Sequence, residues 1–479
     1  MSWKQISLIG IFLMISISSM GQDFEPDLSS CNWIADVGAR TQPVSRGVIY
    51  NPSDFGAVGD GVTLCTKSIQ ESIDKCAELG GGVVRFQTGI YLTGSVFLKS
   101  NVILDIPKGV QIEGSQDIND YKEIPTRVAG IEMDWPAGLI NIIDQHNVAI
   151  TGDGVVHGKG KVFWDKYHSM RKEYDPKGLR WVVDYDCKRP RGIIIENSKD
   201  VMLKDFVLYQ AGFWSVHILY SEYVTVQGMT INNNIEGKGP STDGVDIDSS
   251  SRILVQNCYV NCNDDNFCLK AGRDSDGLKV NRPCEYIVIR DCIAGRGDGL
   301  FTCGSETSGS VRNVLIYNMK GLGTKYGLRF KSTSQRGGTI ENIYMYNIQM
   351  DGVRDPFVVN LNWNPSYSNS KLPEGYNYGE LPIHWKKLLG VVPPEKGMPK
   401  FKNMFFENVH AINAQTCIKV TGIEESTIDN FQFKNVSFEG DNAGNISYAK
   451  NWKFTDFKVR GAKENKLKLS NNKDVRIKD

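Results

Sequence analysis

The chain has 479 residues, of which 41% are hydrophobic and 23% are charged, so it carries enough apolar material for a large core. Lysine and arginine together number 55, as do aspartate and glutamate, and the formal net charge is zero. This balance argues against a bulk electrostatic partner, and we expect neither nucleic acid nor an anionic membrane surface as a ligand.

The first 21 residues have the pattern of a secretory signal peptide. Lys4 supplies a positive charge, and the apolar run from Ile6 to Ile17 is too short to span a bilayer. Small residues follow, which places cleavage before Gln22; a buried first helix is the alternative. No later apolar run is long enough to cross a membrane. We therefore expect a secreted or periplasmic protein in which residues 22–48 form an N-terminal extension.

An amphipathic helix is predicted over Ser68 to Leu79. Ile69, Ile73 and Cys76 fall on one face together with Leu79, and three glycines directly after Leu79 end the helix. Repeated short strands surround it, and a stack of such strands needs a cap at its end. We expect the helix to cap the first coil.

A short pattern recurs between residues 49 and 459. Alternating aliphatic residues lead to a turn of Asn, Ser, Gly or Asp, and then alternate again. Such strands bury their apolar face only by stacking coil on coil, which predicts an all-β parallel β-helix. A β-propeller is the alternative, but repeats near 40–45 residues are not seen. Equivalent positions, 23 to 34 residues apart, are Val201, Val224, Ile253, Ile287, Val314 and Ile343.

Two segments depart from this repeat. Residues 365–399 are rich in Pro, Gly, Tyr and Trp, and we expect a long surface loop that covers the active face. Residues 460–479 are polar and mostly basic, which predicts a solvated tail.

The chain has 11 cysteines, and export permits disulfides. Their spacing does not fit a zinc site, and only 6 histidines are present, so we expect no metal. We expect the cysteines to be small buried side chains, with one or two bridges among them.

Alternation along several strands predicts one charged outer face. In Gly244-Val-Asp-Ile-Asp248 the apolar Val245 and Ile247 point inward, so Asp246 and Asp248 point outward. Successive coils stack about 4.8 Å apart, which brings outward residues of neighbouring coils together. The same rule turns outward His217, Lys270, Arg329 and Lys331.

Four further carboxylates stand at strand entries: Asp243, Asp264, Asp265 and Asp298. Crowded carboxylates shift each other's pKa values, so that one stays protonated while its neighbours ionise. Inverting glycoside hydrolysis requires such a pair, an acid for the leaving oxygen and a base for a water on the opposite face. The alternative is a set of polar turn residues at a corner of the solenoid.

These motifs resemble glycoside hydrolase family 28, the polygalacturonases and their relatives. The ordered set is Ser241-Thr-Asp-Gly-Val-Asp-Ile-Asp248, Asp264-Asp265, Gly297-Asp-Gly299 and Arg329-Phe-Lys331. The earlier run Asp54-Phe-Gly-Ala-Val-Gly-Asp-Gly61 resembles the entry of many pectin-degrading β-helices. The resemblance covers roughly Asn51 to Phe457. It implies a right-handed β-helix and inverting hydrolysis without metal or cofactor.

The resemblance also implies roles for individual residues. Asp264 would be the general acid, and Asp243 and Asp265 would activate the water. Arg329 and Lys331 match a pair that holds substrate carboxylates, which suits galacturonate because each residue of it carries one. We add as substrate contacts Asp298, His217, Lys270, Asp246, Trp214 and Tyr367, with buried packing as the alternative for Trp214.

Two positions depart from the family pattern. Asp298 stands where the family usually has a histidine that supports the catalytic acid, and Ser241 stands where it has an asparagine. Asp298 could keep the acid protonated by repulsion or could bind a different sugar hydroxyl. Endo-cleavage of plain homogalacturonan is therefore in doubt, and exo-action is an option.

The sequence thus predicts a secreted inverting hydrolase of α-galacturonosidic bonds in pectin, acting as a monomer on the polysaccharide or its oligosaccharides. One alternative is a polysaccharide lyase on the same fold, in which acidic residues hold Ca²⁺. Another is a non-catalytic solenoid that binds carbohydrate. The sequence does not identify the pectin fraction.

Overall fold

The computed structural model describes residues 28–29, 31–45 and 47–477. The chain divides into two units, Met1–Asn32 and Trp33–Asp479, and the second holds nearly all described residues. The predicted signal peptide lies outside the described residues. Among those that are described, no helix is long and apolar enough to cross a membrane.

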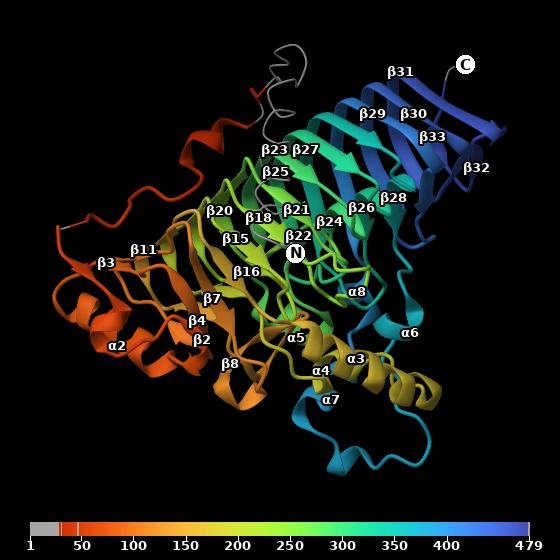
Figure 1. Ribbon diagram of the computed structural model, residues 1–479. Helices are drawn as coiled ribbons and strands as arrows, with labels where there is room; N and C mark the ends of the chain where they lie inside the picture. The colour runs from red at the N-terminus through yellow and green to blue at the C-terminus, as the bar shows by residue number, and fades with distance from the viewer. Residues whose placement is uncertain (1–27, 30, 46, 478–479) are drawn as a thin grey trace. The chain divides into compact units, whose positions relative to one another are not determined.

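The second unit is a parallel β-helix, as predicted. Within the described part of the chain, thirty-one strands join one sheet, and each inner strand pairs in parallel with its equivalents in the coils before and after it (Figure 1). The strand β16 (Val216–Leu219), for example, pairs with β13 (Ile193–Glu196) on one side and β19 (Val245–Asp248) on the other. Parallel pairing of this kind satisfies the backbone of every inner coil and stacks like side chains inside the helix.

The strands form three columns. Column 1 contains β5 (Val96–Phe97), β10 (Ile140–Ile143), β13, β16, β19, β22 (Phe267–Lys270), β24 (Gly299–Cys303), β26 (Tyr326–Lys331) and β28 (Asp355–Asn360). Column 2 begins with β1 (Ile49–Tyr50), β3 (Gly82–Arg85), β6 (Val102–Asp105), β11 (His146–Thr151), β14 (Lys199–Lys204), β17 (Glu222–Gln227) and β20 (Ser251–Gln256). Column 3 contains β2 (Asp60–Leu64), β4 (Gly89–Thr93), β7 (Val110–Gly114), β12 (Val155–His157), β15 (Val207–Tyr209), β18 (Thr230–Asn232) and β21 (Tyr259–Asn261).

The later strands are longer and continue from one column into the next. They are β23 (Cys284–Ala294), β25 (Val311–Leu322), β27 (Thr339–Asp351), β29 (Lys400–Thr421), β30 (Ile428–Ser447) and β31 (Ala449–Glu464), followed by β32 (Lys468–Ser470) and β33 (Lys473–Val475). Most of residues 460–475 are exposed, yet the segment includes the end of β31 together with β32 and β33 and so belongs largely to the last coil. The reason is that Val475 pairs with Trp452 and is buried against the core, although its neighbours are charged.

The first coil is capped by α2 (Thr66–Glu78), close to the predicted helix. Ile69, Ile73 and Cys76 are buried and join the main hydrophobic core, whereas Leu79 is 56% exposed. Figure 1 shows α2 at the end of the stack that contains β2, β3 and β4.

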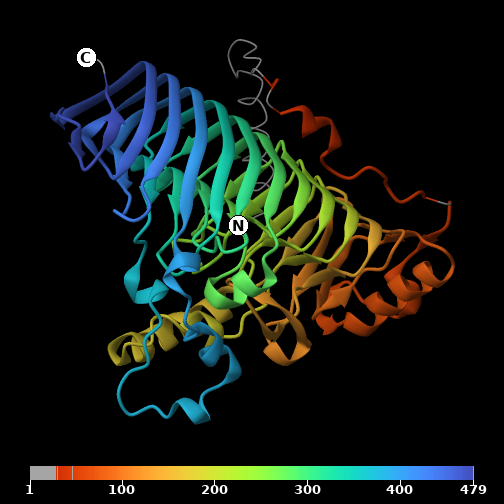
Figure 2. The ribbon, with the colours of Figure 1, turned by 180° about the vertical axis from the view of Figure 1, so that it is seen from behind.

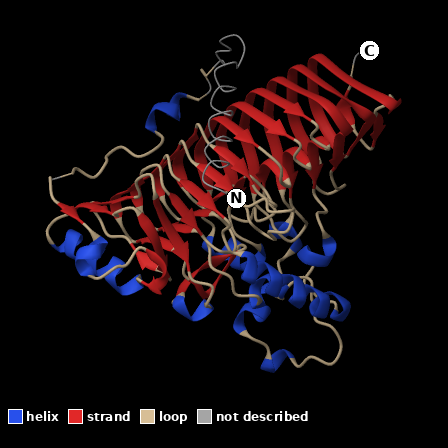
Figure 3. Ribbon diagram, in the orientation of Figure 1, coloured by secondary structure: helices blue, strands red, loops and turns tan. Residues whose placement is uncertain are grey.

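The remaining helices gather on one side of the β-helix, outside column 1 (Figures 2 and 3). They are α3 (Lys161–Tyr174), α4 (Val183–Asp186), α5 (Asp274–Val280), α6 (Pro365–Ser368), α7 (Ile383–Leu388) and α8 (Pro394–Gly397). The chain also forms short 3-10 turns: η1 (Asn32–Asp36), η2 (Pro52–Phe55), η3 (Ile118–Asp120), η4 (Asp175–Lys177) and η5 (Tyr378–Glu380). The strands β8 (Glu123–Val128) and β9 (Ile131–Pro136) form an antiparallel hairpin outside the parallel sheet. The predicted loop 365–399 thus contains short helices.

All eleven cysteines lie in the described residues and are buried, and the ten from Cys65 to Cys417 are free thiols. The expectation of one or two bridges is therefore wrong. Most of these cysteines occupy inward positions of the strands or their turns, where a small apolar side chain fills the core.

Asparagines mark the corner where the long strands bend. Asn318, Asn347 and Asn408 each have a φ between 50° and 57°, the left-handed region in which asparagine is tolerated. Their amides form a ladder: Asn347 donates to Asn318 at 2.8 Å, and Asn408 donates to Asn347 at 3.1 Å. Each coil therefore fixes the corner of the next.

We predict that Asn347→Ala lowers the free energy of unfolding by about 2–4 kcal/mol, because it loses two ladder hydrogen bonds and strains a left-handed residue. Asn347→Gly loses the same hydrogen bonds, but glycine adopts a positive φ without strain, so its loss of unfolding free energy should be roughly 1–2 kcal/mol smaller. Urea unfolding of both variants measures the difference. Equal losses would show that backbone conformation does not matter at this corner.

Candidate active site

The predicted alternation is observed along column 1. Val245 and Ile247 belong to the main core, and Asp246 and Asp248 point to the other side of the strand. The outer face is not exposed, however. Asp246 and Asp248 are 0% exposed because the β8–β9 hairpin and other non-repeating segments cover this part of the helix. The prediction of a solvent-facing charged surface is therefore wrong. Some of the charged side chains line a pocket, and others, such as Asp246 and Asp248, are fully buried beside it.

The pocket has a volume of about 210 Å³ and lies over the strands β19 to β26. It brings together most of the predicted residues, namely Asp243, Asp264, Asp265, Lys270, Asp298, Lys331, Trp214 and Tyr367. Its other lining residues include Arg180, Asp184, Phe213, Ser241, Glu306 and Trp363. A larger surface pocket of about 340 Å³, beside Lys122 and Lys188, contains none of the predicted residues.

Asp265 is held in its ionised form. Its carboxylate accepts hydrogen bonds from Lys331 Nζ at 2.8 Å, Thr302 Oγ1 at 2.6 Å and Arg329 Nη1 at 3.3 Å. Burial opposes ionisation, but Lys331 and Arg329 outweigh it and hold the pKa of Asp265 below its usual range. At neutral pH this group can accept a proton but has none to give.

Asp264, the next residue, behaves in the opposite way. Burial, followed by repulsion from Asp243 and Asp265, raises the pKa of Asp264 well above its usual range. Burial and repulsion raise the pKa of Asp243 as well, but Lys270 Nζ lies 3.5 Å from its Oδ2 and favours its charge. Lys270 thus favours the charged form of Asp243, whereas Asp264 has no cation in hydrogen-bonding contact among the described residues.

Lys270 lies among three carboxylates. Its Nζ is 3.3 Å from Asp246 Oδ1 and 3.8 Å from Glu306 Oε2, in addition to its contact with Asp243, and it lies 4.8 Å from the centre of the Trp214 ring. Neither oxygen of Asp246 accepts a hydrogen bond from the described residues, and burial raises the pKa of Asp246 to about 7. Asp246 lies behind Lys270 and does not line the pocket.

Asp298 stands beside Asp264. It lies 3.2 Å from Lys325 Nζ and 3.6 Å from Arg329 Nη1, and its backbone N–H donates to the carbonyl of Asp264 at 2.9 Å. Its charge is one of the causes that raise the pKa of Asp264. Arg329 is divided between Asp265 and Asp298 and does not line the pocket, so Lys331 is the member of the predicted pair that lines it.

His217 is buried behind Trp214, and its ring lies 4.8 Å from the indole in an edge-on contact. Its Nδ1 accepts from Arg191 at 2.7 Å, and burial lowers its pKa to about 4. Because His217 does not reach the pocket, the prediction that it contacts substrate is wrong. Its observed contacts hold Trp214 in place.

Comparison with known proteins identifies the family. The model of glycosyl hydrolases family 28 matches residues 88–379, which include every residue of the pocket. The chain belongs to glycosyl hydrolases family 28. It is therefore a glycoside hydrolase, as predicted.

Several relatives of this family 28 chain are polygalacturonases by name. A probable polygalacturonase of Vitis vinifera is 30% identical over 345 residues, covering 68% of this chain and 67% of that protein. An exo-poly-alpha-D-galacturonosidase of Dickeya chrysanthemi is 24% identical, and the match covers 68% of this chain and 60% of that protein. The crystal structure of a hyperthermoactive exopolygalacturonase from Thermotoga maritima has a TM-score of 0.74 and 25% identity, covering 89% of this chain and 94% of that one.

The family 28 pocket contains residues that sequence reasoning missed. Glu306 follows the strand β24, and Trp363 follows β28, both at strand exits that the alternation rule does not address. Arg180 and Asp184 come from the segment around α4, where no repeat pattern marks them. A strand-exit carboxylate such as Glu306 could have been found by extending the search from strand entries to strand ends.

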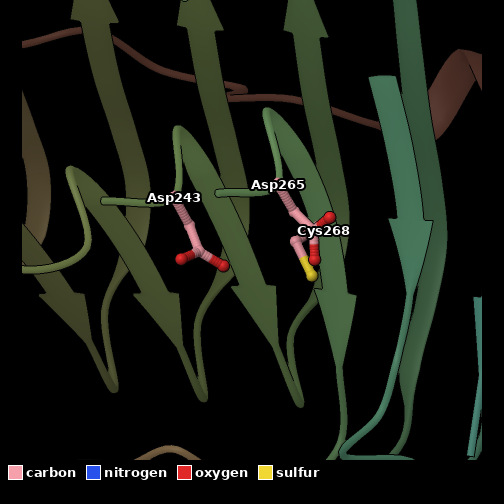
Figure 4. Close-up of side chains that lie close together, drawn as sticks. All are labelled: Asp243, Asp265 and Cys268. Carbon is pink, nitrogen blue, oxygen red and sulfur yellow. The ribbon is translucent and has the colours of Figure 1, made fainter. Parts of the chain in front are cut away.

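One group of side chains has the spacing of a metal site. Ligand atoms of Asp243, Asp265 and Cys268 lie within 4.8 Å of one another (Figure 4). The donors do not suit a cation. Burial raises the pKa of the Cys268 thiol well above its usual range, so it stays protonated, and Asp265 already accepts from Lys331. The ammonium groups of Lys270 and Lys331 occupy the place that a metal would take in this cluster.

We predict a pH-dependent gain in stability for Asp246→Asn. Because burial raises the folded pKa of Asp246 to about 7, the folded protein keeps a proton there that the unfolded chain releases above about pH 4. The wild type therefore loses stability relative to the variant as the pH rises from 4 to 7, by on the order of 2–4 kcal/mol.

Unfolding in urea at pH 4.5, 6 and 8 measures this difference. Asp456→Asn, at an exposed carboxylate, is the matched control and should show no such trend. A constant difference between Asp246→Asn and wild type across this range would contradict the assignment.

Proposed function

We propose that this family 28 enzyme is a secreted, inverting hydrolase that removes terminal galacturonate residues from pectic chains. The observation that carries the proposal is the pocket that gathers Asp243, Asp264 and Asp265, in which burial and repulsion raise the pKa of Asp264 while Lys331 and Arg329 hold the pKa of Asp265 below its usual range. The polygalacturonase names of the relatives support the α-galacturonosidic bond as the target. Secretion is supported by the expected signal peptide at residues 1–21.

The three carboxylates divide the work of hydrolysis. Asp264 donates its proton to the glycosidic oxygen as the bond breaks, since its raised pKa keeps that proton available near neutral pH. Asp243 and Asp265 hold a water molecule, and the one that accepts its proton is the general base. Water attack from the face opposite the leaving group inverts the anomeric centre.

The cations of the pocket suit an acidic sugar. Lys331 lines the pocket and is 6% exposed, so it can meet a substrate carboxylate while its bond to Asp265 orients it. Trp363 lies 4.6 Å from Lys331 Nζ, with its ring available as a wall for a sugar face. Arg329 supports this arrangement from behind through Asp265 and Asp298.

Exo-action is supported by the size and walls of the pocket. Its volume of about 210 Å³ is below the roughly 300–1,000 Å³ of sites that enclose drug-sized ligands, so it accommodates a short part of a chain. The buried side chains of Asp184, Phe213 and Trp214 form one wall, and Tyr367 stands in another. A small pocket with walls on these sides favours a chain end over the middle of a polymer.

The products of polygalacturonate digestion test the proposal. We expect galacturonate monomer from the first time points, released as the β-anomer from an α-linked chain, which NMR of the early reaction detects. A ladder of oligomers would instead indicate endo-cleavage. The α-anomer as first product would contradict the roles given to Asp243 and Asp265. An unsaturated product, seen by ultraviolet absorbance and lost with chelator, would indicate a lyase.

Replacement of the acid should separate activity from folding. We expect Asp264→Asn to lower kcat by roughly 10²- to 10⁴-fold with no loss of thermal stability, because it removes a buried carboxyl with a raised pKa. Asp265→Asn is the matched comparison. It should lower both activity and the melting temperature, since it leaves Lys331 and Arg329 without their carboxylate. Near-normal turnover of Asp264→Asn would refute its role as the acid.

A further inference from the structure

The segment around α4 brings a surplus of positive charge to one end of the pocket. The carboxylate of Asp184 accepts a hydrogen bond from Arg180, and Arg189 Nη2 lies 3.5 Å from its other oxygen. The hydroxyl of Ser241, just before the Asp243 strand entry, lies 3.4 Å from Asp184 as well. Two guanidinium groups therefore share one carboxylate, and this end of the pocket carries one uncompensated positive charge.

Only one of the two arginines can offer that charge to a ligand. The Arg189 side chain is 0% exposed, is enclosed by the rings of Tyr167 and Phe213, and donates to the carbonyl of Pro240 at 2.7 Å. Arg180 lines the pocket with its side chain 22% exposed. Its one hydrogen bond among the described residues goes to Asp184, although a guanidinium has five N–H donors.

The other cations of the pocket are committed to carboxylates of the catalytic cluster. Lys331 donates to Asp265, and Lys270 lies among three acidic groups. The strand β19, which follows Asp243, and the strand β26, which carries Lys331, are three coil steps apart, or about 14 Å. The long side chain of Lys331 spans part of this distance, because its Nζ lies 2.8 Å from Asp265, whose carboxylate lies within 4.8 Å of that of Asp243. Arg180 and Lys331 are distinct binding groups because they pair with different carboxylates, Asp184 and Asp265.

We propose that Arg180 binds the carboxylate of the terminal galacturonate, the sugar whose glycosidic bond is cut. This inference rests on the proposed function and adds the residue that selects an acidic sugar at the closed end of the pocket. A guanidinium meets a carboxylate through two parallel hydrogen bonds, and the ring of Tyr367, 4.9 Å from Arg180, holds the guanidinium plane in place. Arg180 selects an acidic terminal sugar, whereas Lys331 meets the carboxylate of the next sugar, which belongs to the leaving group.

The chain offers a close control for a merely structural ion pair. Arg171 on α3 also pairs with an aspartate four residues later, Asp175, and also lies over a tyrosine ring, at 5.9 Å from Tyr167. It does not line the pocket. If Arg180 acts only to hold α4 through Asp184, its replacement should resemble Arg171→Met, with a small loss of stability and no change in sugar preference.

The test compares two probes that differ only in the charge of the terminal sugar. They are p-nitrophenyl α-D-galacturonide and p-nitrophenyl α-D-galactoside, each used as a competitive inhibitor of trigalacturonate hydrolysis, so that neither probe has to be cleaved. Arg180→Met, Arg180→Lys, Arg171→Met and the wild type are measured side by side, with thermal melting as a check on folding.

We expect the wild type to bind the galacturonide at least tenfold more tightly than the galactoside. Arg180→Met should weaken the galacturonide by tenfold to a hundredfold and change the galactoside by less than threefold, Arg180→Lys should recover part of the loss, and Arg171→Met should change neither. Equal weakening of both probes, or none, in a folded Arg180→Met would overturn the inference. A wild type that does not cleave trigalacturonate would instead refute the proposed function, and direct calorimetry with the two probes would still decide the role of Arg180.

Discussion

Parallel stacking in register is the constraint on which the site depends. Residues at the same place in successive coils lie about 4.8 Å apart, so a charge in one coil limits what its neighbours can carry. The outward row in column 1 runs His217, Asp246, Cys268, Thr302 and Arg329, in which no two neighbours carry the same charge. The acids that crowd together, Asp243, Asp264 and Asp265, stand at strand entries, where backbone hydrogen bonds still link one coil to the next, as from Gly244 N–H to the carbonyl of Asp265 at 2.9 Å.

The same geometry explains how adjacent residues acquire opposite ionisation. Asp264 and Asp265 are neighbours in sequence, yet the backbone directs Asp265 toward Thr302, Lys331 and Arg329 and leaves Asp264 without a cation in hydrogen-bonding contact among the described residues. Burial acts on both carboxyls, so the difference in pKa arises from the cations two coils further on. Two adjacent carboxyls with pKa values shifted in opposite directions thus require only a dipeptide and a correctly placed strand.

Much of this arrangement could be predicted from the sequence because it follows from periodicity. Alternation assigned Asp246, Lys270 and Lys331 to the outer side of column 1, and the strand-entry acids formed the expected cluster. What could not be predicted came from segments without a repeat. The β8–β9 hairpin buries Asp248 through Arg127, and the α4 segment supplies Arg180. The strand pattern predicts the direction in which a side chain points but not whether other segments cover it. The side chain of His217 points outward yet is buried, so the prediction that it contacts substrate was wrong.

The last coil has a consequence for how separate molecules behave. Beyond the two residues that pair with β33, much of β31 is an open strand edge, whose free N–H and C=O groups could pair with another chain. Its exposed side chains include Lys453, Lys458, Arg460 and Lys463. Two molecules meeting end to end would bring these cations within a strand spacing of each other. Three of these cations pair with Asp456, Glu439 and Asp441, and α2 covers the other end of the stack. Pairing along this edge would therefore join two molecules and could not extend into a fibre.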